Sequence, residues 1–145
     1  MRFLMMVRAN QDTEAGVMPS DDALMAVMTN YNEEMAKAGV LLDGAGLQSS
    51  SKRARIKFSG GKATVRDGPF DSRELIAGYW LIQTKSRDEA IEWVKRCPAP
   101  HGKTAEAEIE LGQLFELDDF APSPAIDDAR RLEQELANKK ELPSI

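Results

Sequence analysis

Short apolar runs, bounded by charged or glycine-containing stretches, dominate the pattern of the chain. Runs in which apolar residues alternate or continue are typical of β-strands, because side chains along a strand point alternately to two faces. Residues 54–68 predict a hairpin, since Ile56 and Phe58 alternate with charged residues and Gly60-Gly61 supplies a turn. The other predicted strands are 2–8, 40–48, 75–84 and 105–117.

Three amphipathic stretches predict helices at 19–39, 86–97 and 125–140. Ser20 or Asp21 is expected to cap the first helix, and Ser86 the second. Apolar residues spaced three and four apart form one stripe on each helix. The stripes predicted to be buried are Leu24, Val27, Met28, Tyr31 and Met35, then Ala90, Ile91 and Val94, then Ile126, Ala129, Leu132 and Leu136.

The order of these elements predicts the fold class. Strand, helix, strands, helix and strand match a ferredoxin-like α+β fold, an antiparallel sheet with helices on one face. An appended C-terminal helix follows. Pro122 and Pro124 interrupt the pattern, so we expect a domain over residues 1–121 and a helical extension over 122–145.

The second face of the predicted sheet also needs a cover. Strands 2–8 and 75–84 are apolar at consecutive positions, hence on both faces, whereas two helices cover one face. A second copy of the chain is the simplest cover, so the pattern predicts a homodimer whose sheets face each other. The helix at 125–140 is expected to dock within this dimer; swapping across it or binding another protein are the alternatives.

Composition narrows the possible partners and cofactors. The chain has 145 residues, of which 42% are hydrophobic and 30% charged, with a net charge of -5. This balance argues against nucleic acid as a partner, and no apolar run is long enough to cross a membrane. The N-terminal apolar run is too short for a signal peptide, so a cytoplasmic protein is expected. A single Cys indicates no internal disulfide and no multi-cysteine metal site, and a single His indicates no His-rich metal cluster, which leaves a carboxylate-dominated site as the alternative. No cofactor motif is present.

The Asp-Gly-Pro-Phe sequence at 67–70 is the first candidate for chemistry. Asp67 could act as a general base or accept a hydrogen bond from a ligand. Turn geometry explains the same residues, because Asp, Gly and Pro each favour a tight turn, and we prefer this explanation. Phe70 is expected to anchor the core or a dimer interface rather than stack on a ligand.

Several other side chains are candidates for binding or catalysis. Arg66 and Arg73 could bind an anionic ligand, although surface charges of this kind usually stay solvated. Tyr79 and Trp80 are expected in the core, where they could also line an apolar cavity. His101 could act as a general acid or base, but an exposed loop position is favoured.

Four segments resemble a known family when taken in order. They are "DGPF" at 67–70, "ELIAGYW" at 74–80, "DEAIEWVKRCPAPHG" at 88–102 and "AEIELGQLFELDDF" at 107–120. With residues 31–65, they are similar to the YCII-related family, in its subgroup named for the Asp-Gly-Pro-Phe motif. The resemblance covers about residues 1–120 and implies a ferredoxin-like fold in a dimeric α/β-barrel.

The resemblance implies two kinds of function. Most members of the subgroup have no known biochemical activity, while distant relatives are small enzymes with a His–Asp pair. The first half of this chain contains no His to match that pair. We therefore expect a homodimer that binds a small organic ligand near its interface, with or without turnover. The alternative is a non-enzymatic accessory or regulatory protein, because some members are encoded beside extracytoplasmic-function sigma factors.

Overall fold

The computed structural model of the protein describes residues 1–16, 22–102 and 105–141. The chain forms two compact units, Met1–Gln113 and Leu114–Ile145. The division predicted between residues 121 and 122 lies inside the second unit.

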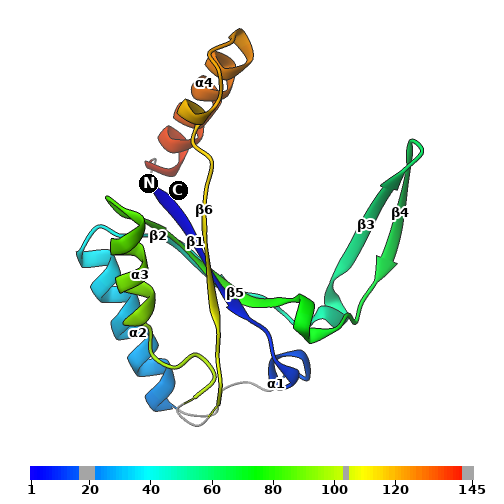
Figure 1. The fold of residues 1–145 in the computed structure, drawn as a ribbon, viewed down its shortest axis with the longest axis vertical. Coiled ribbons are helices and arrows are strands. Elements are labelled where there is room, and N and C mark those ends of the chain that lie inside the picture. Colours follow the sequence, from blue (N-terminus) through cyan, green and yellow to red (C-terminus); the bar gives the residue numbers. More distant parts are fainter. Residues whose placement is uncertain (17–21, 103–104, 142–145) are drawn as a thin grey trace. The chain divides into compact units, whose positions relative to one another are not determined.

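The first unit holds most of the regular structure (Figure 1). Its strands are β1 (Arg2–Arg8), β2 (Leu41–Gly46), β3 (Ala54–Ser59), β4 (Lys62–Asp67), β5 (Ile76–Gln83) and β6 (Ile109–Gln113). Its α-helices are α1 (Gln11–Glu14), α2 (Asp22–Lys37) and α3 (Arg87–Lys95), and short 3-10 turns span Ser50–Lys52 and Ser72–Glu74. Each predicted strand and helix of this unit is therefore present.

The four-stranded sheet has the order β2-β5-β1-β6, and each neighbouring pair is antiparallel. Helix α2 connects β1 to β2, and α3 connects β5 to β6, so two split βαβ units interleave. The prediction of a ferredoxin-like α+β fold is confirmed. The hairpin β3–β4 is a separate two-stranded sheet, inserted between the second and third strands of this fold.

One face of the sheet forms the core with α2 and α3. Phe3 and Met5 of β1 are fully buried, and they cluster with Tyr31 and Met35 of α2 and with Trp93 of α3. The Tyr31 hydroxyl donates a hydrogen bond of 2.7 Å to the Trp93 carbonyl, which ties the two helices together. The helices therefore cover the same face, as predicted (Figure 1).

The opposite face of the sheet is less buried. We call it the open face and define it by Leu4, Met6, Tyr79 and Leu81. Register places these residues together, because Leu4 pairs with Leu81 and Met6 with Tyr79. All four are only partly buried. Within this unit, β1 and β5 are therefore covered on the helix side alone, whereas the sequence predicted a cover on both sides.

The predicted stripe on α2 is buried in its second half only. Tyr31 and Met35 are buried, whereas Val27 is 43% exposed. The predicted caps Ser20 and Asp21 lie outside the described residues. On α3, Ser86 caps as expected, since its hydroxyl accepts a hydrogen bond of 3.1 Å from the Glu89 amide.

The hairpin has two chemically distinct faces. Alternate cross-strand pairs place Ile56 opposite Val65 and Phe58 opposite Ala63 on one side. The pairs between them carry Arg55, Arg66, Lys57 and Lys62 on the other side. Gly60 and Gly61 adopt φ of +55° and +77°, which side chains with a Cβ rarely tolerate, and so form the turn.

The second unit contains a short 3-10 turn (Leu117–Asp119) and helix α4 (Pro124–Glu141). Arg130 on the helix pairs with Asp118 at 2.6 Å. The predicted apolar stripe of α4 is only partly covered, since Leu132 and Leu136 are 56% and 50% exposed. Docking of this helix within a dimer stays a prediction.

Candidate functional site

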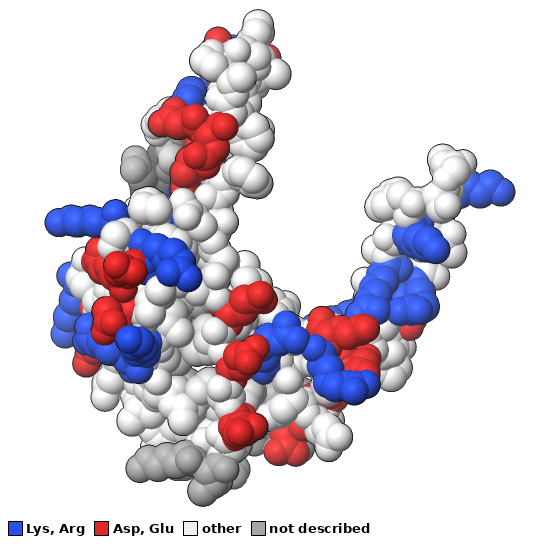
Figure 2. Space-filling model, in the orientation of Figure 1, with Lys and Arg blue, Asp and Glu red and all other residues white. Residues whose placement is uncertain are grey.

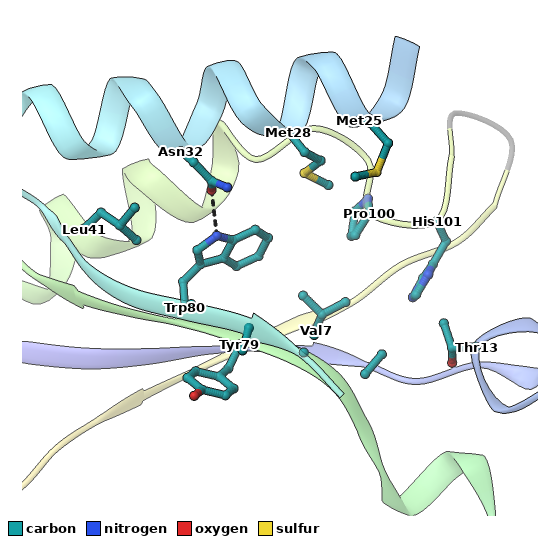
Figure 3. A pocket seen from close by; sticks show the side chains of 15 residues that line it. Val7, Thr13, Met25, Met28, Asn32, Leu41, Tyr79, Trp80, Pro100 and His101 are labelled. Carbon is teal, nitrogen blue, oxygen red and sulfur yellow. Dashed lines mark hydrogen bonds between the residues drawn. The ribbon is translucent and has the colours of Figure 1, made fainter. Parts of the chain in front are cut away.

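A cavity of about 450 Å³ lies between α2 and the helix-covered face of the sheet (Figure 3). Its apolar lining combines side chains from the sheet, from α2 and from the loop after α3, namely Val7, Met25, Met28, Leu41, Trp80 and Pro100. The volume falls within the range of small-molecule sites, which are mostly apolar with a few polar groups.

Three glycines form the floor of the cavity on the sheet side. Gly44, Gly46 and Gly78 stand where side chains would otherwise project from β2 and β5. A Cβ at residue 44 would lie 2.9 Å from Cδ1 of Trp80, so the indole needs a glycine beside it. A Cβ at Gly46 would meet nothing within 4 Å, which marks open space in the cavity.

Asn32 and Trp80 supply a fixed polar contact in the cavity wall. The indole Nε1 of Trp80 donates a hydrogen bond of 2.8 Å to Oδ1 of Asn32. Because an indole N–H only donates, this bond fixes the orientation of the amide. Among the described residues the amide nitrogen of Asn32 has no acceptor, so it is available to a ligand.

His101 lies at the other end of the cavity, in the loop after α3 (Figure 3). Its Nε2 is 2.9 Å from the Arg8 carbonyl, which can only accept, so Nε2 carries the proton. Nδ1 is then the ring atom that can accept a hydrogen bond or take a proton. His101 is partly buried rather than fully exposed.

The structure brings three of the predicted site residues together at the cavity. Tyr79, Trp80 and His101 all line it, but the Tyr79 ring points to the other side of the sheet from the Trp80 ring (Figure 3). The other candidates, Asp67, Arg66, Phe70 and Arg73, lie at or beside the base of the hairpin, and none of them lines the cavity. No described residue places a carboxylate beside His101 in this lining.

The Asp-Gly-Pro-Phe segment is held against the 3-10 turn at Ser50. The peptide between Gly68 and Pro69 is cis, and the Gly68 amide donates a hydrogen bond of 2.9 Å to the Arg53 carbonyl. The buried Ser50 hydroxyl accepts one of 2.9 Å from the Phe70 amide. The contacts of this motif in the described chain are thus those of a folded turn, while the Asp67 side chain is exposed.

Glu14 of α1 completes this network. Its carboxylate accepts hydrogen bonds from the Ser50 amide, at 2.9 Å, and from the Ser50 hydroxyl. The hydroxyl bond is the main reason that the pKa of Glu14 is lowered. Residues from three separate segments therefore fix the base of the hairpin.

Arginines surround Phe70 beside this turn. The Arg55 guanidinium lies 3.9 Å from the centre of the Phe70 ring, and that of Arg66 lies 5.2 Å away. Arg73 is paired with Asp71 at 2.6 Å, and hydrogen bonds from Arg73 lower the pKa of Asp71 to about 2. Arg66 and Phe70 therefore interact with each other, and Arg73 is already paired on the surface.

The sequence pattern did not single out several residues that shape the site. Asn32, Met25 and the Gly46 position appear as ordinary members of a helix and a strand, and their role depends on packing between distant segments. The Glu14–Ser50 contact joins residues 36 positions apart. Asn10 and Thr13 form a capping box around α1, a local signal that could have revealed this four-residue helix.

Cys97 and the acidic residues carry no evident chemistry. Burial raises the pKa of the Cys97 thiol to about 11, which favours the unreactive protonated form. Within the described ranges, no three His, Cys, Asp or Glu side chains are placed to hold a metal ion. The same residues include no helix long and apolar enough to cross a membrane.

A family model for the YCII-related domain matches residues 1–111, which covers the cavity and both βαβ units up to the last two residues of β6. The chain belongs to the YCII-related family. This chain is similar to the "Uncharacterized protein R00369" of Rhizobium meliloti (strain 1021). The two are 28% identical over 104 residues, which is 71% of this chain and 84% of the relative.

Proposed function

We propose that this YCII-related protein is a homodimer that binds a small, mainly apolar organic molecule in the cavity between α2 and the sheet. The observation that carries the proposal is a cavity of about 450 Å³ with an apolar wall and one polar group near each end, Asn32 and His101. The Asn32 amide nitrogen can donate to a ligand, and Nδ1 of His101 can accept from one. A ligand with a flat apolar body and one or two polar substituents suits this lining.

The site supports binding more strongly than turnover. General acid–base catalysis usually needs a second group to orient or share the proton. His101 is held by a backbone carbonyl, and Asp67 does not line the cavity. Any turnover would therefore depend on His101, with Asn32 as a hydrogen-bond donor to the substrate.

The homodimer is proposed from the open face. Leu4, Met6, Tyr79 and Leu81 present apolar side chains on the side of the sheet that α2 and α3 do not cover. The cavity lies on the helix-covered side, so the proposed ligand site is separate from this surface.

The Asp67-Gly68-Pro69-Phe70 motif supports the proposal that this chain belongs to the subgroup of the family that is named for that motif. The cytoplasmic location stays a prediction.

Fluorescence from Trp80 provides a direct test of the ligand site. The chain has two tryptophans, so Trp93→Phe leaves Trp80 as the reporter. The probe is 1-anilinonaphthalene-8-sulfonate, an aromatic anion of suitable size. We expect saturable quenching of Trp80, abolished by Gly46→Leu, because that side chain would occupy the empty space of the cavity.

Gly112→Ala is the matched control for this test. Gly112 pairs with Leu4, and a Cβ there would lie 3.3 Å from the flexible end of Met6. Quenching should survive in this variant. Equal quenching in the wild type and in Gly46→Leu, with both folded by circular dichroism, would show that the probe does not use the cavity. Native mass spectrometry of the purified protein would then identify any co-purified ligand.

A regulatory role is the second candidate, supported by the exposed apolar residues of α4. Leu132 and Leu136 are at least half exposed on a helix whose other side is charged. The proposed partner is an extracytoplasmic-function sigma factor encoded nearby. Leu132→Ser with Leu136→Ser should abolish co-purification with that factor, and retention of the complex would argue against this candidate.

A further inference from the structure

The lining of the cavity carries no acidic or strongly basic side chain among the described residues, since none of them is Asp, Glu, Lys or Arg. Arg8, whose carbonyl holds His101, turns its guanidinium to the Arg73 carbonyl instead. Figure 2 shows other Lys and Arg side chains gathered along the β3–β4 hairpin. An unpaired charge is costly in an apolar site, so a charged group on a ligand has to stay in solvent outside the cavity.

Only some of the polar side chains in the lining have atoms left for a ligand. The Thr13 hydroxyl donates to the Asn10 carbonyl and accepts from the Asn10 amide, both at 2.9 Å, so the capping box of α1 uses it. The Tyr79 ring points to the other side of the sheet (Figure 3). Asn32 and His101 are the side chains that remain for polar contacts with a ligand.

These two side chains have opposite roles in hydrogen bonding. Oδ1 of Asn32 accepts from the Trp80 indole, which leaves the amide nitrogen as a donor. Nε2 of His101 donates to the Arg8 carbonyl, which leaves Nδ1 as an acceptor. Neither role can reverse while these contacts hold, because an indole N–H only donates and a carbonyl only accepts.

The donor and the acceptor lie at opposite ends of the cavity. Asn32, Met28 and Met25 follow each other on α2 at spacings of four and three residues, so they share one face of the helix. Two helical turns separate the first from the last, a distance of about 10 Å. Figure 3 shows Met25 and His101 together at the end away from Asn32, with the apolar side chain of Val7 between the two ends.

We propose that the cavity selects an elongated, uncharged organic molecule that has a hydrogen-bond acceptor at the Asn32 end and a donor at the His101 end. A ketone, ester or amide carbonyl supplies such an acceptor, and a hydroxyl group supplies such a donor. The inference rests on the proposed ligand-binding function and specifies the class of ligand that this site takes.

Three probes of matched size test the two polar contacts in the wild-type protein. They are 6-acetyl-2-naphthol, 2-acetyl-6-methylnaphthalene, which lacks the donor, and 6-isopropyl-2-naphthol, which lacks the acceptor. Isothermal titration calorimetry at pH 7 measures their affinities. The first probe should bind about threefold to tenfold more tightly than either of the others, as expected for one hydrogen bond. Equal affinity of all three would overturn the proposal.

Two variants assign each contact to its residue. Asn32→Asp keeps an acceptor for the Trp80 indole but removes the amide donor, so it should erase the preference for 6-acetyl- over 6-isopropyl-2-naphthol. His101→Phe should erase the preference for 6-acetyl-2-naphthol over 2-acetyl-6-methylnaphthalene. Comparing ratios cancels any general effect of a variant on binding. With both variants folded by circular dichroism, the opposite assignment, or unchanged ratios, would overturn the proposed order of the two groups.

Two further probes test charge and length. 6-Hydroxy-2-naphthoic acid carries a carboxylate in place of the acetyl group and should bind at least about tenfold more weakly than 6-acetyl-2-naphthol. The isomer 4-acetyl-1-naphthol has the same composition, but its two groups lie across a single ring. It should bind at least about threefold more weakly, because it makes only one of the two contacts. A carboxylate or an isomer that binds as tightly as 6-acetyl-2-naphthol would overturn the proposal.

Gly46→Leu separates failure of this inference from failure of the proposed function. A leucine side chain would occupy empty space in the cavity, so binding of 6-acetyl-2-naphthol should be lost in this variant. Loss of binding together with equal affinities of the three matched probes would refute the selectivity and keep the cavity as a ligand site. Equal binding to the wild type and to Gly46→Leu would refute both.

Discussion

The backbone carbonyl oxygen of Ser50 lies only 1.8 Å from the position that a Cβ on Gly68 would occupy. The two backbone segments lie so close that no side chain fits between them, which explains why the Asp-Gly-Pro-Phe motif has a glycine at this position. A Gly68→Ala substitution must therefore move either the Ser50 turn or the base of the hairpin.

Gly68→Ala should lower the free energy of unfolding by about 3 kcal/mol or more, because the new methyl group meets backbone rather than a flexible side chain. Gly46→Ala is the control, since a Cβ there meets nothing within 4 Å. Urea denaturation measures both. Equal stability of the two variants would show that the Ser50 carbonyl is not this close in solution.

The Ser50 hydroxyl links two segments, so its removal should be costly. Ser50→Ala leaves the Phe70 amide and the Glu14 carboxylate without this partner in a part-buried site. We expect a loss of about 1–3 kcal/mol in the free energy of unfolding. Ser51→Ala, at an exposed position one residue later, should change it by less than about 0.5 kcal/mol.

Glu14 should make stability depend on pH in the acid range. In the folded protein the hydrogen bond from the Ser50 hydroxyl holds the pKa of Glu14 below its usual value, so the stabilising contribution of this carboxylate is complete above that usual value. The contribution is lost as the pH falls through the folded pKa. The difference in unfolding free energy between wild type and Glu14→Gln should therefore be largest near neutral pH and shrink below about pH 4.5. A difference that stays constant from pH 7 to pH 3 would contradict this assignment.

Cys97 should react slowly with Ellman's reagent in the folded protein. A rise in the thiol pKa from 9.0 to about 11 lowers the thiolate fraction at pH 8 about a hundredfold. The native rate should thus be at least about a hundredfold below the rate in concentrated urea. Cys97→Ser provides the blank, and similar native and denatured rates would show that the thiol is accessible and ionised.

Asp67→Asn should leave probe binding unchanged. The sequence offered Asp67 as a possible base, but its side chain is exposed at the end of β4 and does not line the cavity. The quenching titration should give an affinity within about twofold of wild type, and His101→Ala should weaken it further than that. A tenfold loss in Asp67→Asn with unchanged stability would place the ligand at the base of the hairpin instead.

Local signals were sufficient to locate the strands of the sheet and the helices α2 and α3, because each of these elements carries its own pattern in the sequence. Ile56 and Phe58 alternate with charges, Gly60-Gly61 makes a turn, and Ser86 caps a helix, so each element could be located from its neighbours. The prediction that Asp-Gly-Pro-Phe forms a turn agrees with its hydrogen bonds to Arg53 and Ser50.

The cavity could not be located in the same way. Asn32 contacts Trp80, 48 positions away, and His101 contacts Arg8, 93 positions away. Such contacts depend on how α2 and the loop after α3 cross the sheet, which no local pattern encodes. Trp80 and His101 were identified by residue type, while Asn32 and Gly46 acquire their roles only through packing.

Hydrogen bonds at Arg53, Gly68 and Ser50 fix the base of the hairpin. The length of the hairpin can therefore change without altering the geometry of the four-stranded sheet. Beyond that base, residues of β3 and β4 pair one to one, and successive pairs point to alternate faces of the hairpin. Two extra residues on each strand would therefore extend the hairpin by about 7 Å and keep every side chain on its original face. Evolution can thus vary the reach of this insertion by steps of two residue pairs while the ligand cavity and the βαβ units stay as they are.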